Sequence, residues 1–300
     1  MKPTDVTPHT PMPSRRIRIV EVGPRDGLQN ESAIVPTAEK VAFIEMLAQS
    51  GLTDIEVSSF VNPERVPQLA DAEAVFARLQ KRPGVRYTAL VANERGLDRA
   101  IAAGVEGVAL FTAASEAFAL RNIGKTIEQS LTVFAGLGAR ARAAGMWVRG
   151  YVSTAFACPF AGPIAPGAVV PVVARLLDIG VDEISVADTI GSALPADVTA
   201  LTEALLPILP LERFAYHFHD TGGMALMNVR TALDAGISIF DSSAGGLGGC
   251  PFAPGAPGNL ATEDLLGLLE DRGIATGIDV EQVRAASRLL GDRLHYRQDA

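Results

Sequence analysis

The chain has few cysteines and no long uninterrupted apolar run. Its two cysteines, Cys158 and Cys250, lie far apart in 300 residues, whereas secreted disulfide scaffolds carry many cysteines in a short chain. A reducing compartment is therefore expected, and we predict a cytoplasmic protein. The most apolar stretches are interrupted by Glu106, Glu116 and Arg175, a pattern that excludes a membrane span.

Runs of basic residues are also lacking. Lys and Arg number 26 against 34 Asp and Glu, a formal net charge of −8, so a nucleic-acid partner is not expected. Residues 1–14 are rich in Pro and Thr and lack the apolar core of a signal peptide, and we interpret them as a mobile leader. No low-complexity linker divides the rest, so one domain is predicted over residues 15–300.

The remaining sequence repeats one pattern, a short β-branched segment followed by a loop and an amphipathic helix. Strands are predicted at residues 18–22, 54–58, 86–91, 107–111, 147–151, 183–186, 214–218 and 238–241. The clearest helices are predicted at residues 38–49, 68–80, 127–144, 169–177 and 224–233. Many strands follow a glycine suited to a left-handed helix cap, as at Gly51, Gly104, Gly145, Gly180 and Gly236.

This alternation predicts parallel strands joined by helical crossovers. We predict a closed (β/α)8 TIM barrel of the α/β class, because about 250 residues are typical for that fold. An open doubly wound sheet is the alternative. A further helix is predicted at residues 280–294, packed outside or over the barrel. In a barrel, the chemistry is expected at the carboxyl ends of the strands.

Unusual polar residues do gather at these strand ends. They lie close to the ends of the first, second, fifth and sixth strands, at Arg25, Asp26, Glu56, Tyr151 and Asp188. His217 and His219 end the seventh strand, and their spacing of two places both imidazoles on one face. Paired imidazoles suit one divalent ion, and packing or hydrogen bonding without a metal is the alternative.

Arg25 and Asp26 lie within the turn Gly-Pro-Arg-Asp-Gly at residues 23–27. A buried carboxylate here suits a metal ligand, and a guanidinium beside it suits the stabilisation of an oxyanion. Glycine and proline that merely shape a turn are the alternative interpretation.

Residues 244–259 form a loop rich in Gly and Pro after the eighth strand. Proline interrupts it, which argues against a dinucleotide fingerprint, and we interpret it as a lid. Cys250 in its middle is placed to bring a thiol to a substrate, whereas Cys158 is interpreted as a packed core residue. Asn259 lies at the start of the next expected helix, either as an N-cap or as a neutral oxygen ligand.

Together these motifs closely resemble those of 3-hydroxy-3-methylglutaryl-CoA (HMG-CoA) lyases, which belong to a superfamily of metal-dependent barrel lyases and synthases. The resemblance spans residues 17–270. Its most specific part is Gly-Gly-Leu-Gly-Gly-Cys-Pro at residues 245–251. The Arg-Asp turn and the segment His-Phe-His-Asp-Thr at residues 217–221 are shared with the synthases.

The resemblance implies a retro-Claisen cleavage of HMG-CoA to acetyl-CoA and acetoacetate. It implies a Mg²⁺ or Mn²⁺ ion held by Asp26, His217, His219 and Asn259. It implies that Arg25 faces the thioester carbonyl, that Cys250 is catalytic, and that Glu56 and Asp188 are acidic active-site residues. Gln29, Tyr151 and Ser185 match residues that line the substrate pocket. A homodimer is expected, because the family is often dimeric.

Two departures from the family pattern concern the acyl group. Ser32 stands where the family commonly has Lys, and Gly222 stands where it usually has Tyr. A lyase for a related 3-hydroxyacyl-CoA such as citramalyl-CoA, which would yield pyruvate and acetyl-CoA, is therefore the alternative. A barrel that only binds CoA esters is the non-catalytic alternative, and the intact set of ligand residues argues against it.

Overall fold

The structure is a computed structural model that describes residues 16–248 and 258–294. Eight parallel strands close into a barrel in the order β1-β10-β9-β8-β5-β4-β3-β2. Their bounds are β1 Arg18–Glu21, β2 Asp54–Phe60, β3 Arg86–Val91, β4 Gly107–Ala113, β5 Trp147–Ser153, β8 Glu183–Asp188, β9 Phe214–Phe218 and β10 Ile239–Ser242. The predicted closed barrel is confirmed, and the open sheet is excluded.

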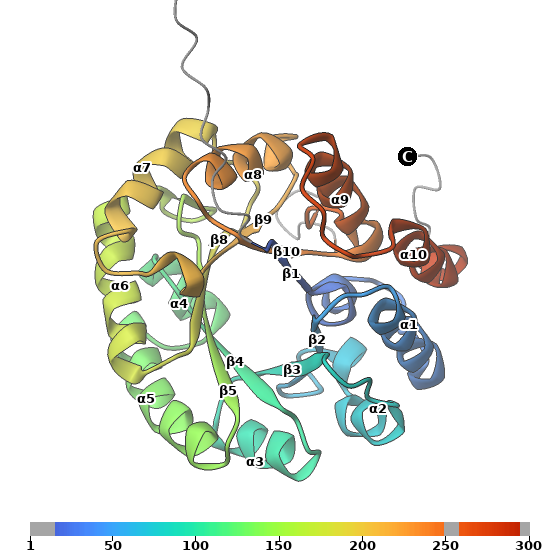
Figure 1. Cartoon of the computed structure of the whole chain (residues 1–300). Coiled ribbons are helices and arrows are strands. Elements are labelled where there is room, and N and C mark those ends of the chain that lie inside the picture. Colours follow the sequence, from blue (N-terminus) through green and yellow to red (C-terminus); the bar gives the residue numbers. More distant parts are fainter. Residues whose placement is uncertain (1–15, 249–257, 295–300) are drawn as a thin grey trace, which may run out of the picture.

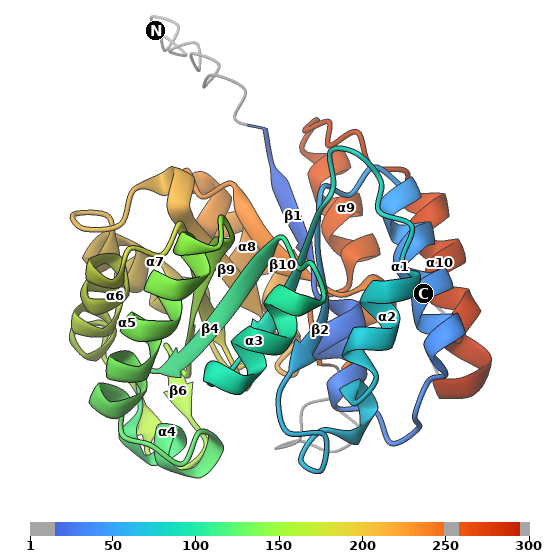
Figure 2. The ribbon, with the colours of Figure 1, turned by 90° about the horizontal axis from the view of Figure 1, so that it is seen from below.

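A ring of helices surrounds the barrel (Figure 1), with α1 and α2 on the opposite side from α5 and α6 (Figure 2). The helices are α1 Thr37–Gln49, α2 Ala72–Arg78, α3 Glu94–Ala102, α4 Glu116–Asn122, α5 Ile127–Ala143, α6 Pro166–Ile179, α7 Pro195–Leu205, α8 Ala225–Asp234, α9 Thr262–Asp271 and α10 Val280–Leu294. The predicted extra C-terminal helix is α10, which lies against α1 and α9. No helix in the described ranges is long and apolar enough to cross a membrane.

Shorter elements lie in the loops. A π-helical turn, η1 (Gly23–Gly27), follows β1, and the small strands β6 (Ala157–Cys158) and β7 (Gly162–Pro163) form a hairpin after β5. The 3-10 turns are η2 Pro67–Leu69, η3 Leu211–Arg213 and η4 Ala244–Gly246. The five glycines predicted to precede strands all have positive φ, between 67° at Gly104 and 102° at Gly51.

Three local predictions were wrong. The helix predicted at residues 68–80 is divided into η2 and the shorter α2. Glu56 lies in the middle of β2 rather than near its end, because β2 continues through an irregularity after Glu56 to Phe60. The helix expected to start at Asn259 begins only at Thr262, so Asn259 is not its N-cap. The predicted leader, residues 1–14, lies outside the described residues.

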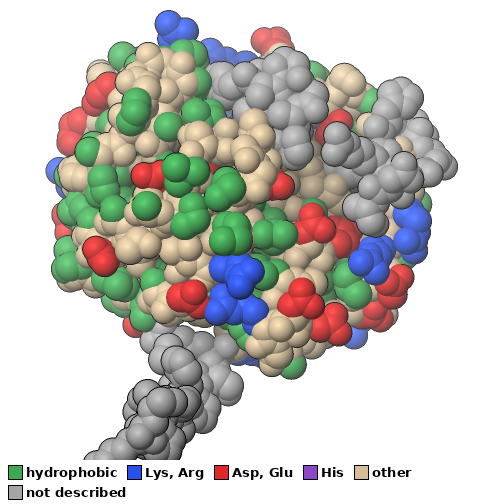
Figure 3. All heavy atoms as spheres, turned by 90° about the horizontal axis from the view of Figure 1, so that it is seen from above, with side chains coloured by type: hydrophobic (Ala, Val, Ile, Leu, Met, Phe, Trp, Pro, Cys, Tyr) green, Lys and Arg blue, Asp and Glu red, His purple; other side chains and the backbone are tan. Residues whose placement is uncertain are grey.

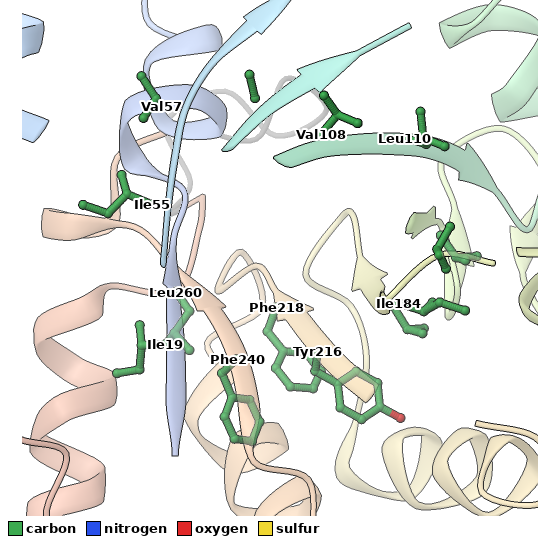
Figure 4. Packing of buried hydrophobic residues seen from close by; sticks show 14 of the residues in the cluster. Ile19, Ile55, Val57, Val108, Leu110, Ile184, Tyr216, Phe218, Phe240 and Leu260 are labelled. Carbon is green, nitrogen blue, oxygen red and sulfur yellow. The ribbon is translucent and has the colours of Figure 1, made fainter. Parts of the chain in front are cut away.

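The barrel strands turn alternate side chains to opposite faces of the sheet. One set faces outward and fills the core between strands and helices, as at Ile19, Ile55, Val57, Val108, Leu110, Ile184, Tyr216, Phe218 and Phe240 (Figure 4). The other set faces the barrel axis and includes charged groups. Arg149 of β5 reaches Asp241 of β10, although these strands are not neighbours. Such a contact crosses the interior of the barrel.

Candidate metal centre and active site

Asp26 and Arg25 are presented by the π-helical turn η1. The backbone N–H groups of Arg25, Asp26 and Gly27 all donate to the carbonyl of Val22, and π-helical turns are frequent at functional sites. Gly27 is required for close approach, because a Cβ there would lie 2.7 Å from Cβ of Leu247. The turn is therefore packed directly against the segment that follows β10.

Asn259 is brought to the histidines by an extended segment, not by a helix. It forms an isolated antiparallel bridge with His219. Leu260 N donates to the Phe218 carbonyl at 3.0 Å, and Ser243 N donates to the Leu260 carbonyl at 2.9 Å. This segment thus lies between the ends of β9 and β10 and places Asn259 beside the turn that carries Asp26.

The three predicted ligands Asp26, His217 and His219 converge, with one ligand atom from each lying within 4.8 Å of the others. Nε2 of His217 lies 3.8 Å from Oδ2 of Asp26, and Nε2 of His219 lies 3.9 Å from the same oxygen. Both imidazoles are buried. Three such side chains at one point fit a divalent cation.

The side-chain amide of Asn259 completes the cluster. Its Nδ2 donates to Oδ2 of Asp26 and to the carbonyl of Leu247, each at 3.0 Å. Its Oδ1 is buried and has no hydrogen-bond partner among the described residues. Because the nitrogen donates to two acceptors, the orientation of the amide is fixed. The free oxygen is then the atom of Asn259 that would bind a cation at this cluster.

Arg25 controls the charge of Asp26. Its guanidinium contacts the carboxylates of both Asp26 and Glu56. Burial alone would raise the pKa of Asp26, but Arg25 and the two neighbouring imidazoles hold that pKa well below its usual range. Asp26 is therefore an anion in this site, the form that binds a cation.

Glu56 and Tyr151 hold Arg25 from the barrel interior. Tyr151 Oη donates to Oε2 of Glu56 at 3.0 Å, and the Arg25 guanidinium lies 5.6 Å from the centre of the Tyr151 ring. Burial, followed by smaller opposing effects of Arg149 and Glu56, raises the pKa of Tyr151 well above its usual value. The phenol stays protonated and able to donate.

A second polar layer lies beneath His217 and includes Asp241, Arg149 and Glu183, which sequence analysis did not predict as site residues. Asp241 Oδ2 lies 3.2 Å from Nδ1 of His217 and accepts a hydrogen bond from Ser185 Oγ at 2.9 Å. Arg149 donates to Oδ1 of Asp241 at 2.6 Å and lies 2.9 Å from Glu183. Charged residues at alternate positions of otherwise apolar strands were the available signal for this layer.

Asp188 is the last residue of β8, and its carboxylate is engaged with its own loop. Its two oxygens accept from the backbone N–H groups of Ser192 and Ala193, and burial raises its pKa despite these bonds. Gln29 is half-buried just beyond η1. Cys250 lies outside the described residues.

The two departures from the family pattern lie at exposed positions. Ser32 is exposed before α1. Gly222 donates to the Gly191 carbonyl at 3.0 Å, and a Cβ at Gly222 would lie 2.7 Å from that oxygen. A larger side chain at residue 222 would require this turn to move. The glycine therefore allows close backbone contact between the loops after β8 and β9.

The chain is a (β/α)8 barrel with a candidate divalent-metal centre at the carboxyl ends of its strands, where barrel enzymes carry their active sites.

Comparisons with known proteins define the family. The chain matches the HMGL-like family over residues 16–290. Mitochondrial hydroxymethylglutaryl-CoA lyase of Bos taurus is 47% identical over 286 residues, which cover 95% of this chain and 88% of the relative. The hydroxymethylglutaryl-CoA lyase structure from Pseudomonas aeruginosa has a TM-score of 0.93 at 44% identity and covers 95% of both chains.

A further relative was solved with ligands. The HMG-CoA lyase of Acinetobacter baumannii, in complex with coenzyme A and 3-methylmalate, has a TM-score of 0.89 at 38% identity. The similarity covers 93% of this chain and 92% of that one. The chain therefore belongs to the HMG-CoA lyase family, a family of carbon–carbon lyases.

Proposed function

We propose that this chain cleaves HMG-CoA to acetyl-CoA and acetoacetate with a divalent metal ion. The observation that carries the proposal is the convergence of Asp26, His217 and His219 at the carboxyl end of the barrel. These three residues match positions that the family resemblance implies as metal ligands. Arg25 beside the cluster adds the fixed cation that a developing enolate requires.

Asp26, His217, His219 and Asn259 are the proposed ligands of Mg²⁺ or Mn²⁺. The buried, unpartnered Oδ1 of Asn259 and the ionised Asp26 support this ligand set. Carboxylate and amide oxygens suit both ions, and the two imidazoles are compatible with Mn²⁺. When bound, the ion supplies Lewis acidity that makes the substrate hydroxyl easier to deprotonate.

The protein's own groups carry the remaining steps. A base at the cluster removes the proton of the C3 hydroxyl, and the C2–C3 bond then breaks. The oxygen becomes the ketone of acetoacetate, and the bonding electrons form the enolate of acetyl-CoA. The low pKa of Asp26 makes it a poor base. Arg25 donates to the thioester oxygen as negative charge develops there.

Cys250 is the proposed donor that returns a proton to C2 of the enolate. Its support is the motif at residues 245–251, because the residue lies outside the described ranges. Glu56 and Tyr151 hold Arg25 in position toward the substrate. Asp188, whose carboxylate fixes the loop after β8, shapes the same rim.

A related 3-hydroxyacyl-CoA is the second candidate substrate. Gly222 favours it, because this residue leaves the rim without the phenol that the family usually carries there. The complex of the Acinetobacter baumannii relative with coenzyme A and 3-methylmalate supports a CoA thioester as the substrate class.

The deciding experiment is the release of acetyl-CoA from HMG-CoA and citramalyl-CoA, with Mg²⁺, Mn²⁺ or chelator present. Metal-dependent cleavage with HMG-CoA preferred is the expected result. A preference for citramalyl-CoA would move the specificity to the second candidate. Binding of both thioesters without turnover would leave only the non-catalytic barrel.

The same assay tests Cys250. We expect Cys250→Ala to reduce kcat by about 10²–10⁴-fold, because a positioned proton donor contributes on that order, while Mn²⁺ binding is unchanged. Cys158→Ala is the matched control, since Cys158 of β6 is buried against α4 and its sulfur accepts from Ser115. Near-normal turnover of Cys250→Ala would remove the thiol from the mechanism.

We also propose a cytoplasmic homodimer, from the low cysteine content and the family resemblance. Light scattering of the purified protein tests the dimer, and a monomeric mass at assay concentration would contradict it.

A further inference from the structure

The two ring nitrogens of His217 face different carboxylates. Nε2 faces Oδ2 of Asp26 at 3.8 Å, on the side of the metal cluster. Nδ1 faces Oδ2 of Asp241 at 3.2 Å, on the side of the barrel interior. The two carboxylates therefore lie at opposite edges of one imidazole.

The Asp241 carboxylate decides which nitrogen of a neutral His217 carries the proton. An ionised carboxylate only accepts hydrogen bonds, so Nδ1 of His217 must be the donor in this contact. The lone pair of the neutral ring then lies on Nε2. That nitrogen is the one that faces the metal cluster, and a metal ligand needs its lone pair.

Asp241 is itself held in one orientation. Arg149 donates to Oδ1 at 2.6 Å, and Ser185 Oγ donates to Oδ2 at 2.9 Å. Asp241 is 1% exposed, Arg149 is 1% exposed, and Ser185 has no exposed surface. A buried carboxylate with a charged partner on one oxygen cannot exchange its two oxygens without breaking that ion pair.

We propose that Asp241 is a positioning residue for the metal centre, because it fixes the tautomer of His217. In this proposal Ser185 and Arg149 hold Asp241 in place and do not contact the substrate. The proposal rests on the metal ligand set of the proposed function. Ser185 matches a pocket residue of the family, but in this chain its hydroxyl donates a hydrogen bond to Asp241. The proposal therefore gives Ser185 a different role. Histidine ligands commonly depend on such a carboxylate behind the ring.

Asp241→Asn reverses this hydrogen bond at almost constant shape. Arg149 requires an acceptor at the position of Oδ1, so the amide oxygen takes that position. The amide NH₂ then faces Nδ1 of His217 and Oγ of Ser185. The serine hydroxyl can rotate to accept, but Nδ1 can accept only if the ring proton moves to Nε2. The metal-facing nitrogen then loses its lone pair.

Nitrogen-15 NMR of histidine-labelled, metal-free protein reads this tautomer directly. The chain has four histidines, so the double variant His9→Gln, His295→Gln leaves only His217 and His219 to assign. At a pH where the imidazoles are neutral, we expect Nδ1 of His217 to be protonated in the parent and Nε2 in Asp241→Asn. Ser185→Ala is the matched control, which keeps the carboxylate and therefore the parent tautomer.

Mn²⁺ titration, followed by the electron paramagnetic resonance of the free ion, is the second measurement. We expect Asp241→Asn to raise the Kd for Mn²⁺ by roughly 10–100-fold, and Ser185→Ala to raise it much less. An unchanged tautomer in Asp241→Asn, or an Nε2–H tautomer in the parent, would overturn the proposal. The parent spectrum decides the matter even if Asp241→Asn fails to fold.

The two measurements separate this proposal from the proposed function. A parent protein that binds no Mn²⁺ would contradict the ligand set, and the tautomer would still test Asp241. A normal Mn²⁺ affinity in a folded Asp241→Asn variant would contradict the role of Asp241 and leave the ligand set intact.

Discussion

At the scale of single residues, Glu21 shows how one buried carboxylate can align several functional segments. Its Oε1 accepts from the backbone N–H groups of Gly23 and Ala244, and its Oε2 accepts from Thr262 Oγ1. These three partners begin the turn that carries Asp26, the loop after β10 and the helix after Asn259. Burial raises the pKa of Glu21 to about 7, although all three donors lower it.

Glu21 should make folding stability depend on pH. Its folded pKa lies above its unfolded value, so its contribution is present below the unfolded pKa and is lost as pH rises through about 7. Glu21→Gln keeps an acceptor for both N–H groups and offers an NH₂ to Thr262. We expect the stability of the parent relative to this variant to fall by about 2–3 kcal/mol between about pH 5 and about pH 8.

Urea unfolding of parent and Glu21→Gln across that range measures the difference. Glu31→Gln is the control, because Glu31 is half-buried and burial raises its pKa less strongly. Parallel pH profiles for the parent and Glu21→Gln would show that Glu21 is ionised in the folded protein throughout.

At the scale of elements, α10 supports the active end of the barrel and is more than an appended helix. Its buried residues Val283, Ala286 and Leu290 recur at helical spacing and face α1 and η4. Ser287 Oγ donates to Oε1 of Glu263, whose Oε2 accepts from Gly245 N at 2.7 Å. The helix thus reaches the start of the Gly-rich loop through one carboxylate.

Two adjacent leucines of α10 test its packing. Leu290 is 1% exposed and Leu289 is 41% exposed. We expect Leu290→Ala to lower the free energy of unfolding by about 2–5 kcal/mol, because it leaves a cavity. Leu289→Ala should change it by only about 0.5 kcal/mol. Urea denaturation measures both, and equal losses would mean that α10 does not bury Leu290 against the barrel in solution.

At the scale of the whole molecule, the barrel encloses a chain of charges along its axis. Arg18 contacts Glu183 near the amino ends of the strands, Arg149 joins Glu183 to Asp241, and Asp241 reaches His217. Buried charges are tolerated when they are paired. On the surface seen in Figure 3, basic side chains lie in small groups among acidic and hydrophobic ones, without one continuous basic area.

Metal binding should stabilise the whole fold, because the proposed ligands come from segments far apart in the chain. A ligand that binds only the folded state adds about 2.7 kcal/mol at a concentration 100 times its Kd. For a chain of this size we expect Mn²⁺ to raise Tm by about 4 °C under that condition. His219→Ala should lose most of this increment and keep its circular dichroism.

Differential scanning calorimetry with Mn²⁺ or chelator measures the increment. Glu281→Ala removes an exposed carboxylate of α10 and controls for weak cation binding to a chain of net charge −8. An equal Tm increment in His219→Ala and the parent would place the bound ion elsewhere.

Several features were determined by the sequence alone because they depend on short-range patterns. Apolar strands that alternate with helices, and glycines at helix ends such as Gly180, predicted parallel strands joined by helical crossovers, whereas the closure of the barrel was confirmed only by the structure. The spacing of His217 and His219 placed both on one face, since side chains alternate along any strand. The turn at residues 23–27 joined Arg25 to Asp26 within one short segment.

Which distant side chains meet depends on the tertiary structure. Asp241 reaches Arg149 and His217 because barrel closure turns all three toward one axis, and register sets their height. Asn259 joins the cluster through an extended segment that bridges β9 and β10, where sequence alone left a helix cap open as an alternative. Local sequence does not encode such pairings, because strand register and closure are properties of contacts between distant segments.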